Sequence, residues 1–111
     1  MTTNEFRRLA LGFSGAVESA HMDHPDFRAG GKIFATLGYP EDGWGMVKLT
    51  PAQQRMYVSK AREVFVPCNG AWGRSGCTSV HLASVKENLL HTALAAAYRN
   101  VADKAKKKVC P

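Results

Sequence analysis

The fold of this chain is decided by the stretch Asp26-Phe27-Arg28-Ala29-Gly30-Gly31-Lys32-Ile33-Phe34-Ala35. Two runs rich in strand-forming residues flank Gly30-Gly31, and paired glycines supply the positive φ angles that a tight hairpin turn requires. The stretch therefore predicts two antiparallel strands joined by a short turn.

The register of this hairpin has two alternatives. A two-residue loop places Phe27 opposite Phe34. A three-residue loop leaves Arg28 and Phe34 on one face and aligns the other apolar side chains on the opposite face, namely Phe27, Ala29, Ile33, Ala35 and Leu37. We favour the second register because it turns the charged Arg28 away from the apolar face.

Further candidate strands surround the hairpin, and turn-forming residues separate them. Pro40-Glu41-Asp42-Gly43 is typical of a turn, so its two carboxylates are interpreted as turn formers and not as an acid–base pair. The predicted strands are residues 17–21, 26–29, 32–37, 44–49, 64–66 and 78–82.

Three helices are predicted from capping boxes, in which an N-cap hydroxyl and an acidic or amide residue three positions later bond each other's backbone N–H. Apolar residues at helical spacing follow the first and third boxes, and Pro51 favours a helix over residues 51–60. The boxes are Thr2 with Glu5, Thr50 with Gln53, and Ser84 with Glu87. These elements together predict an α+β fold, an antiparallel sheet with N-terminal, middle and C-terminal helices.

The length and charge of the chain favour one domain over residues 1–102, followed by a basic tail over residues 103–111. The 111 residues are 45% hydrophobic, which is sufficient for one packed core. The net charge is +6, but half of it lies in the tail, where four lysines accompany one aspartate. Mutual repulsion of these lysines predicts that the tail is mobile.

The expected location of the protein is the cytoplasm, without membrane association. No apolar run approaches the roughly 20 residues of a membrane span, and the first residues lack the apolar core of a secretory signal. Cys68, Cys77 and Cys110 form an odd set without metal-binding spacing. They are therefore interpreted as free thiols.

Motifs with catalytic or metal-binding potential are weak in this sequence. His21 and His24 have ligand-like spacing but straddle a strand end and a turn, so no metal site is predicted. Cys77 and His81 lie about 13 Å apart if they share a strand, too far for a nucleophile and its base. The glycine-rich segment 70–76 lacks the Lys-Ser/Thr ending of a P-loop. We therefore expect no enzymatic activity and no cofactor.

Two tryptophans lie near basic residues in the sequence, and this combination suggests binding of nucleic acid. Trp72 lies two positions from Arg74, and Trp44 alternates with Lys48 along a predicted strand, so each indole is placed to stack on a base. The alternative is that both tryptophans complete the core. A third interpretation is an aromatic pocket around Tyr39, Trp44 and Trp72 that takes a protein or small ligand.

Four segments of the chain resemble those of a known family. They are His24-Pro25-Asp26-Phe27-Arg28, then Gly31-Lys32-Ile33-Phe34-Ala35, then residues 44–49, and Trp72-Gly73-Arg74 before residues 78–82. In this combination the chain resembles the MmcQ/YjbR family over almost its whole length to about Val101. The resemblance implies a CyaY-like, frataxin-like α+β fold, described as a double-wing architecture with DNA as the proposed partner. Relatives carry a His-Trp pair where this chain has Gly76-Cys77, so any role of that pair does not transfer.

The resulting hypothesis is a small non-enzymatic protein that binds DNA weakly through phosphate contacts. The predicted binding residues are Arg28, Lys32, Lys48 and Arg74. The alternative is an interaction module that uses the aromatic pocket. Metal handling by analogy with frataxin-like folds is disfavoured because the nine acidic residues are spread over a basic background.

Overall fold

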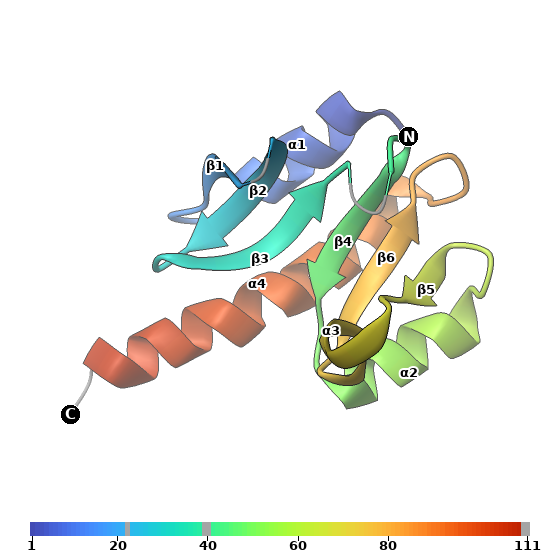
Figure 1. The fold of residues 1–111 in the computed structure, drawn as a ribbon. Coiled ribbons are helices and arrows are strands. Elements are labelled where there is room, and N and C mark those ends of the chain that lie inside the picture. Colours follow the sequence, from blue (N-terminus) through green and yellow to red (C-terminus); the bar gives the residue numbers. More distant parts are fainter. Residues whose placement is uncertain (22, 39–40, 110–111) are drawn as a thin grey trace.

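The strands form one antiparallel sheet. The computed structural model of the protein describes residues 1–21, 23–38 and 41–109, with side chains up to residue 102. Within these residues the sheet has six strands in the order β1-β2-β3-β4-β6-β5, accompanied by four helices (Figure 1). The strands are β1 (Val17–His21), β2 (His24–Ala29), β3 (Lys32–Leu37), β4 (Trp44–Lys48), β5 (Phe65–Pro67) and β6 (Cys77–His81). The helices are α1 (Thr3–Leu11), α2 (Pro51–Lys60), α3 (Gly70–Arg74) and α4 (Glu87–Val109). The predicted α+β class and all predicted strands are confirmed.

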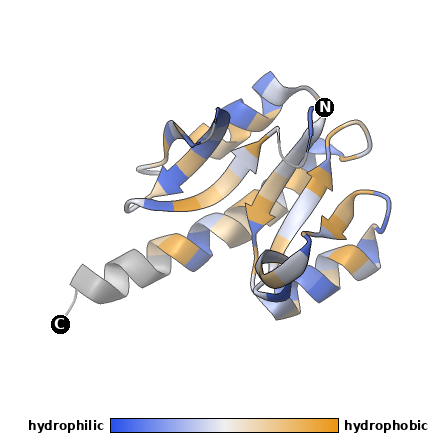
Figure 2. Ribbon diagram, viewed as in Figure 1, coloured by the Kyte–Doolittle hydropathy of each residue, from blue (hydrophilic) through white to orange (hydrophobic). Residues whose placement is uncertain are grey.

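The helices α1 and α4 lie behind the same face of the sheet, as Figure 1 shows. Hydrophobic residues run along β3 and along part of α4, where the two elements pack (Figure 2). Phe6 of α1 packs on Phe27 of β2, with ring centroids 5.9 Å apart, and both side chains are fully buried. Gly45 leaves room for Phe6, since a Cβ atom there would lie 2.8 Å from its ring. The core therefore lies between the sheet and these two helices.

Two of the three predicted capping boxes are confirmed. Thr2 Oγ1 accepts from Glu5 N at 3.1 Å and Glu5 Oε1 accepts from Thr2 N at 3.0 Å. Thr50 and Gln53 make the same reciprocal pair, at 3.2 and 2.9 Å. These local bonds explain why α1 begins at Thr3 and α2 at Pro51.

The third capping box was predicted wrongly. Helix α4 begins at Glu87, and the first helical turn uses the carbonyl of Lys86, which accepts from Leu90 N at 3.0 Å. Ser84 lies in the turn after β6, where its Oγ is 2.7 Å from His81 Nδ1. A partner on the preceding strand therefore competes successfully with the capping role.

The hairpin contains a bulge that neither predicted register anticipated. Next to the turn, Ala29 pairs with Lys32 and Arg28 with Ile33, as a two-residue loop requires. Beyond an irregularity between Phe27 and Arg28, Phe27 pairs with Ala35, as a three-residue loop requires. The favoured register was wrong in placing Phe34 outward, because Phe34 is fully buried and packs edge-on against Phe13 and Tyr98.

The glycine-rich segment predicted as a loop contains the short helix α3. A Cβ atom on Gly73 would lie 1.7 Å from the Cys68 carbonyl oxygen, and one on Gly76 would lie 2.0 Å from the Leu49 carbonyl oxygen. Gly76 also has a φ angle of +113°. Both glycines therefore allow α3 to lie directly against neighbouring backbone.

Helix α4 is the longest element and continues to Val109. Its last residues belong to the predicted tail, whose side chains and last two residues lie outside the described part of the chain. Mobility of the tail therefore stays a prediction. Among the described helices, none combines the length and the apolar composition needed to cross a membrane.

Substitution of the two types of glycine should separate backbone contact from backbone strain. Gly15 has a φ angle of +75° but nothing within 4 Å of an added Cβ, so Gly15→Ala should cost about 1 kcal/mol of unfolding free energy from strain alone. Gly76→Ala adds a collision with backbone at Leu49, so it should cost about 3 kcal/mol or more. Urea denaturation measures the free energy of unfolding of both variants. Equal denaturation midpoints would contradict a close contact between Gly76 and the Leu49 backbone.

Candidate functional site

The four predicted binding residues lie at one end of the sheet. Arg28 and Lys32 flank the β2–β3 turn, and Lys48 ends β4 opposite Cys77, the first residue of β6. Arg74 ends α3, three residues before Cys77. Because neighbouring strands are antiparallel, these positions all lie at the same end of the strands. The topology thus brings together residues that are distant in the sequence.

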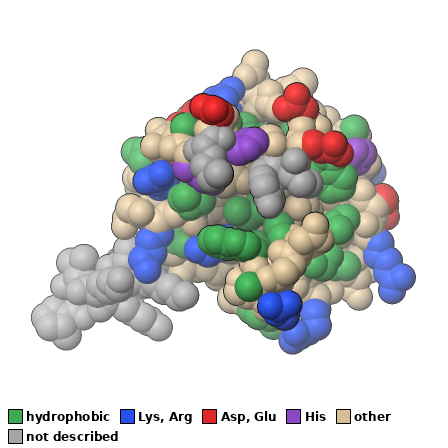
Figure 3. Space-filling view, in the orientation of Figure 1, with side chains coloured by type: hydrophobic (Ala, Val, Ile, Leu, Met, Phe, Trp, Pro, Cys, Tyr) green, Lys and Arg blue, Asp and Glu red, His purple; other side chains and the backbone are tan. Residues whose placement is uncertain are grey.

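The opposite end of the sheet carries acidic turns. Asp23 lies in the β1–β2 turn, and Glu41 and Asp42 lie in the β3–β4 connection, all of them exposed. Figure 3 shows acidic side chains gathered in the upper part of this view and most Lys and Arg side chains lower down. The sheet therefore has a basic end, which we define by Arg28, Lys32, Lys48 and Arg74, and an acidic end.

Arg28 of the basic end is held in an ion pair. Its Nε donates to Asp26 Oδ1 at 2.9 Å and its Nη2 donates to Asp26 Oδ2 at 3.1 Å. His21 Nδ1 on β1 lies 2.8 Å from the same Oδ2, and the Asp26 side chain is inaccessible to solvent. The pair with Arg28, strengthened by His21, holds the pKa of Asp26 below its usual value although burial alone would raise it. The cluster links β1 to β2.

This arrangement corrects the simple view of Arg28 as an exposed phosphate ligand. The residue does face outward, as predicted, and about a third of its side chain is exposed. Its charge, however, is compensated by a carboxylate that has no access to water. Arg28→Glu would place a second carboxylate beside that of Asp26, so Arg28 has a structural role in addition to its positive charge.

The remaining basic residues differ in accessibility. Lys48 and Arg74 are exposed, and neither makes an ion pair with a described residue. Lys32 is half-buried at the hairpin turn. Lys48 and Arg74 are therefore the most accessible cations of the basic end.

The predicted aromatic residues do not form one pocket. Trp44 is half-buried beside His81, with ring centroids 4.8 Å apart, at the acidic end of the sheet. Trp72 lies on α3 at the basic end, with 67% of its surface exposed, so the core interpretation of this residue is wrong. Tyr39 lies outside the described residues. The two tryptophans are separated by the length of β6.

The histidines and thiols give no sign of a reactive centre. Among the side chains that the structure describes, no three His, Cys, Asp or Glu residues are arranged to hold a metal ion. Cys68 and Cys77 are free thiols, and Cys110 lies outside the described residues. Burial raises the pKa of both described thiols, so they stay protonated at neutral pH.

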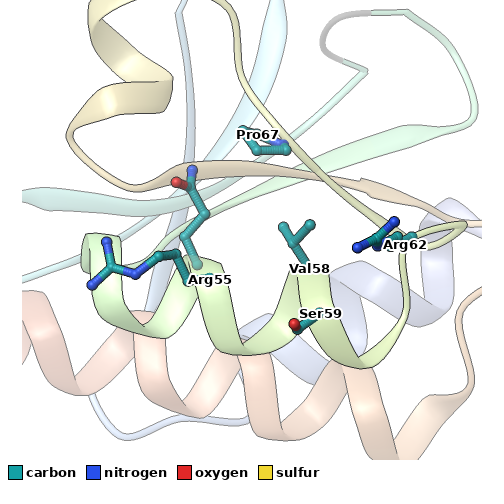
Figure 4. A pocket seen from close by; sticks show the side chains of 6 residues that line it. Arg55, Val58, Ser59, Arg62 and Pro67 are labelled. Atoms are coloured by element: carbon teal, nitrogen blue, oxygen red, sulfur yellow. The ribbon is translucent and has the colours of Figure 1, made fainter.

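A groove beside α2 was not foreseen from the sequence. It has a volume of about 270 Å³ and lies between α2 and the end of β5 (Figure 4). Its lining residues are Gln54, Arg55, Val58, Ser59, Arg62 and Pro67. The spacing of Arg55, Val58 and Ser59 at i, i+3 and i+4 is the signal that places them on one face of α2, whereas Arg62 lies two residues beyond the end of the helix. We call this feature the α2 groove.

The structural role of Arg28 is testable through the pH dependence of stability. Arg28→Met should lower the melting temperature by several degrees at neutral pH, because it leaves the Asp26 carboxylate without its main partner. Since the folded-state pKa of Asp26 is depressed, the stabilisation is present above the pKa of an unfolded aspartate and is lost as pH falls through the folded value. The difference from wild type should therefore shrink below about pH 4.

Arg8→Met provides the matched control. Arg8 pairs with Glu87 at 3.0 Å, but both side chains are more than half exposed, so its loss should change the melting temperature little. Thermal melts from pH 7 to pH 3 compare the two variants. Equal effects at every pH would show that the Asp26 cluster is no stronger than an ordinary surface pair.

Comparison with known proteins identifies the family. A profile of the YjbR family matches residues 11–100. Among solved structures, the chain is similar to Deinococcus radiodurans protein DR2400, which has a DUF419 domain, with a TM-score of 0.79 and 18% sequence identity over 99% of this chain and 89% of that chain. None of the curated proteins matches the chain significantly. The structural likeness confirms the expected fold, and since the profile spans most of the sequence, the chain belongs to the YjbR family.

Proposed function

We propose that the protein is a small, non-enzymatic, cytoplasmic DNA-binding protein that uses phosphate contacts at the basic end of its sheet. Lys48 and Arg74 are the main contacts, Lys32 contributes from the hairpin turn, and Arg28 helps mainly by shaping the β2 surface. Binding of this type is weak and depends on electrostatic attraction to the backbone, with little readout of bases. It corresponds to the partner that the family resemblance implies.

The observation that carries this proposal is the separation of charge along the strands. Basic residues from the β2–β3 turn, β4 and α3 converge at one end, whereas Asp23, Glu41 and Asp42 lie at the other. A polyanion is attracted to the basic end and repelled from the acidic end, so the charge separation orients the protein as it approaches DNA. A net charge of +6 spread evenly would not do so.

The state of the reactive side chains supports a binding role without catalysis. The half-buried thiol of Cys68 and the buried thiol of Cys77 have raised pKa values, so both are protonated at neutral pH and are poor nucleophiles. Asp26 is oriented toward His21, but its negative charge is neutralised by Arg28. The pair is accordingly better suited to joining β1 and β2 than to transferring protons.

The test is the salt dependence of binding to duplex DNA of random sequence. If Lys48 and Arg74 each neutralise one phosphate, Lys48→Ala with Arg74→Ala should reduce the magnitude of the slope of log affinity against log salt by about 2. Both side chains are exposed, so the fold should be retained. Fluorescence anisotropy with a labelled duplex measures the slope.

Two controls separate the basic end from general charge. Lys86→Ala removes an exposed cation just before α4, near the His81 end of the sheet, and should leave the slope almost unchanged. Deletion of residues 104–111 tests the lysine tail, and we expect it to leave the melting temperature nearly unchanged. Loss of binding on tail deletion with no effect of the double variant would refute the proposal. Binding of a neutral ligand that does not respond to salt would favour the interaction-module alternative.

A further inference from the structure

Trp72 is exposed because of how α3 packs. Gly73 faces the backbone so closely that a Cβ atom there would lie 1.7 Å from the Cys68 carbonyl oxygen. Successive residues of a helix point about 100° apart, so the neighbours of an inward-facing residue project away from the contact. Ser75 Oγ donates to the Trp72 carbonyl at 2.9 Å and closes the end of the helix. The indole is therefore held in solvent, with 67% of its surface exposed.

The α2 groove is joined directly to α3. Gln54 Nε2 donates to the Gly73 carbonyl at 3.0 Å and to the Cys77 carbonyl at 2.9 Å. Gln54 also lines the groove, so the groove and the Trp72 helix share a wall. Gln54 thus connects the groove to α3, the helix that carries Trp72 and Arg74.

The cations of this groove are available to a ligand. Arg55 and Arg62 are exposed, and neither makes an ion pair within the described side chains. Arg55 lies on α2, and Arg62 lies in the turn that follows the end of the helix at Lys60. Val58 and Pro67 provide an apolar floor between them (Figure 4).

From this combination we infer that the preferred nucleic acid is single-stranded, with its phosphates along Arg55 and Arg62 and a base stacked on Trp72. The inference rests on the proposed function and narrows its substrate class. In a duplex both faces of each base are covered by neighbouring bases, so an exposed indole has nothing to stack on. A single strand offers unpaired bases, and aromatic stacking combined with cationic phosphate contacts is the usual means of binding it.

The experiment compares a roughly 12-nucleotide oligothymidine with a duplex of the same length, both fluorescently labelled. Wild-type protein should bind the single strand more tightly at equal salt. Trp72→Ala should weaken single-strand binding about tenfold and leave duplex binding unchanged, whereas Trp72→Phe should retain most of the affinity. Arg55→Ala and Arg62→Ala should each lower the magnitude of the single-strand salt slope by about 0.7.

Matched controls use residues far from this surface. Leu11→Ala shortens another exposed apolar side chain, at the end of α1, and Lys86→Ala removes one exposed charge. Neither should alter single-strand binding. Circular dichroism of every variant verifies the fold. Quenching of tryptophan fluorescence by the single strand should be smaller in Trp72→Phe, because Trp44 lies at the other end of the sheet.

The outcomes separate this inference from the proposed function. Duplex binding that equals or exceeds single-strand binding, with no selective effect of Trp72→Ala, overturns the inference and leaves phosphate binding intact. Absence of binding to either nucleic acid overturns both. If poly-glutamate at the same charge concentration displaces the single strand while Trp72→Ala leaves the affinity unchanged, that result overturns the inference in favour of an acidic peptide.

Discussion

The two helices behind the sheet are held by aromatic side chains from one hairpin. Phe27 on β2 packs on Phe6 of α1, and Phe34 on β3 packs on Tyr98 of α4. The bulge places one extra residue, Phe34, in β3 between the pairs Arg28–Ile33 and Phe27–Ala35, and both Phe34 and Ala35 are buried. Arg28 and Asp26 lie two residues apart on β2 and therefore share the face of the sheet opposite Phe27.

The Asp26 cluster is the polar counterpart of that packing. A carboxylate without access to water is tolerable when several donors surround it, and here Arg28 and His21 supply them. The cluster attaches the edge strand β1, whose side chains are all exposed and which therefore gains little from apolar burial. Structural and electrostatic roles thus overlap at Arg28, and the accessible cations of the basic end are found on β4 and α3.

The position of α3 depends on two glycines that contact backbone outside the helix. Gly73 lies against Cys68 and Gly76 against Leu49, the residue that precedes the α2 cap. The contact between Gly76 and Leu49 brings the end of α3 beside the start of α2, where Gln54 bonds to it. Gln54 consequently joins α3, which carries the exposed Trp72, to the groove that Arg55 and Arg62 line.

Features that depend on local interactions were determined by the sequence alone. The boxes at Thr2 and Thr50 involve residues three positions apart, and they predicted the starts of α1 and α2 correctly. The predicted hairpin and strands were confirmed for the same reason, since turn chemistry and alternation act over short distances. The Arg28–Asp26 pair is also local, because residues two apart on a strand share a face.

Features that depend on distant partners were decided by the tertiary structure. The bulge reflects competition between turn geometry and the burial of Phe34 against Phe13 and Tyr98, which lie far away in the sequence. Ser84 does not cap α4 as predicted, because its hydroxyl is hydrogen-bonded to His81 Nδ1. The gathering of Lys48 and Arg74 at one end requires strand pairing, and the position of α3 beside α2 requires the backbone contact of Gly76 with Leu49. The physical reason is that register, burial and close backbone contact are properties of pairs of segments, and the partner segment is chosen when the whole chain packs.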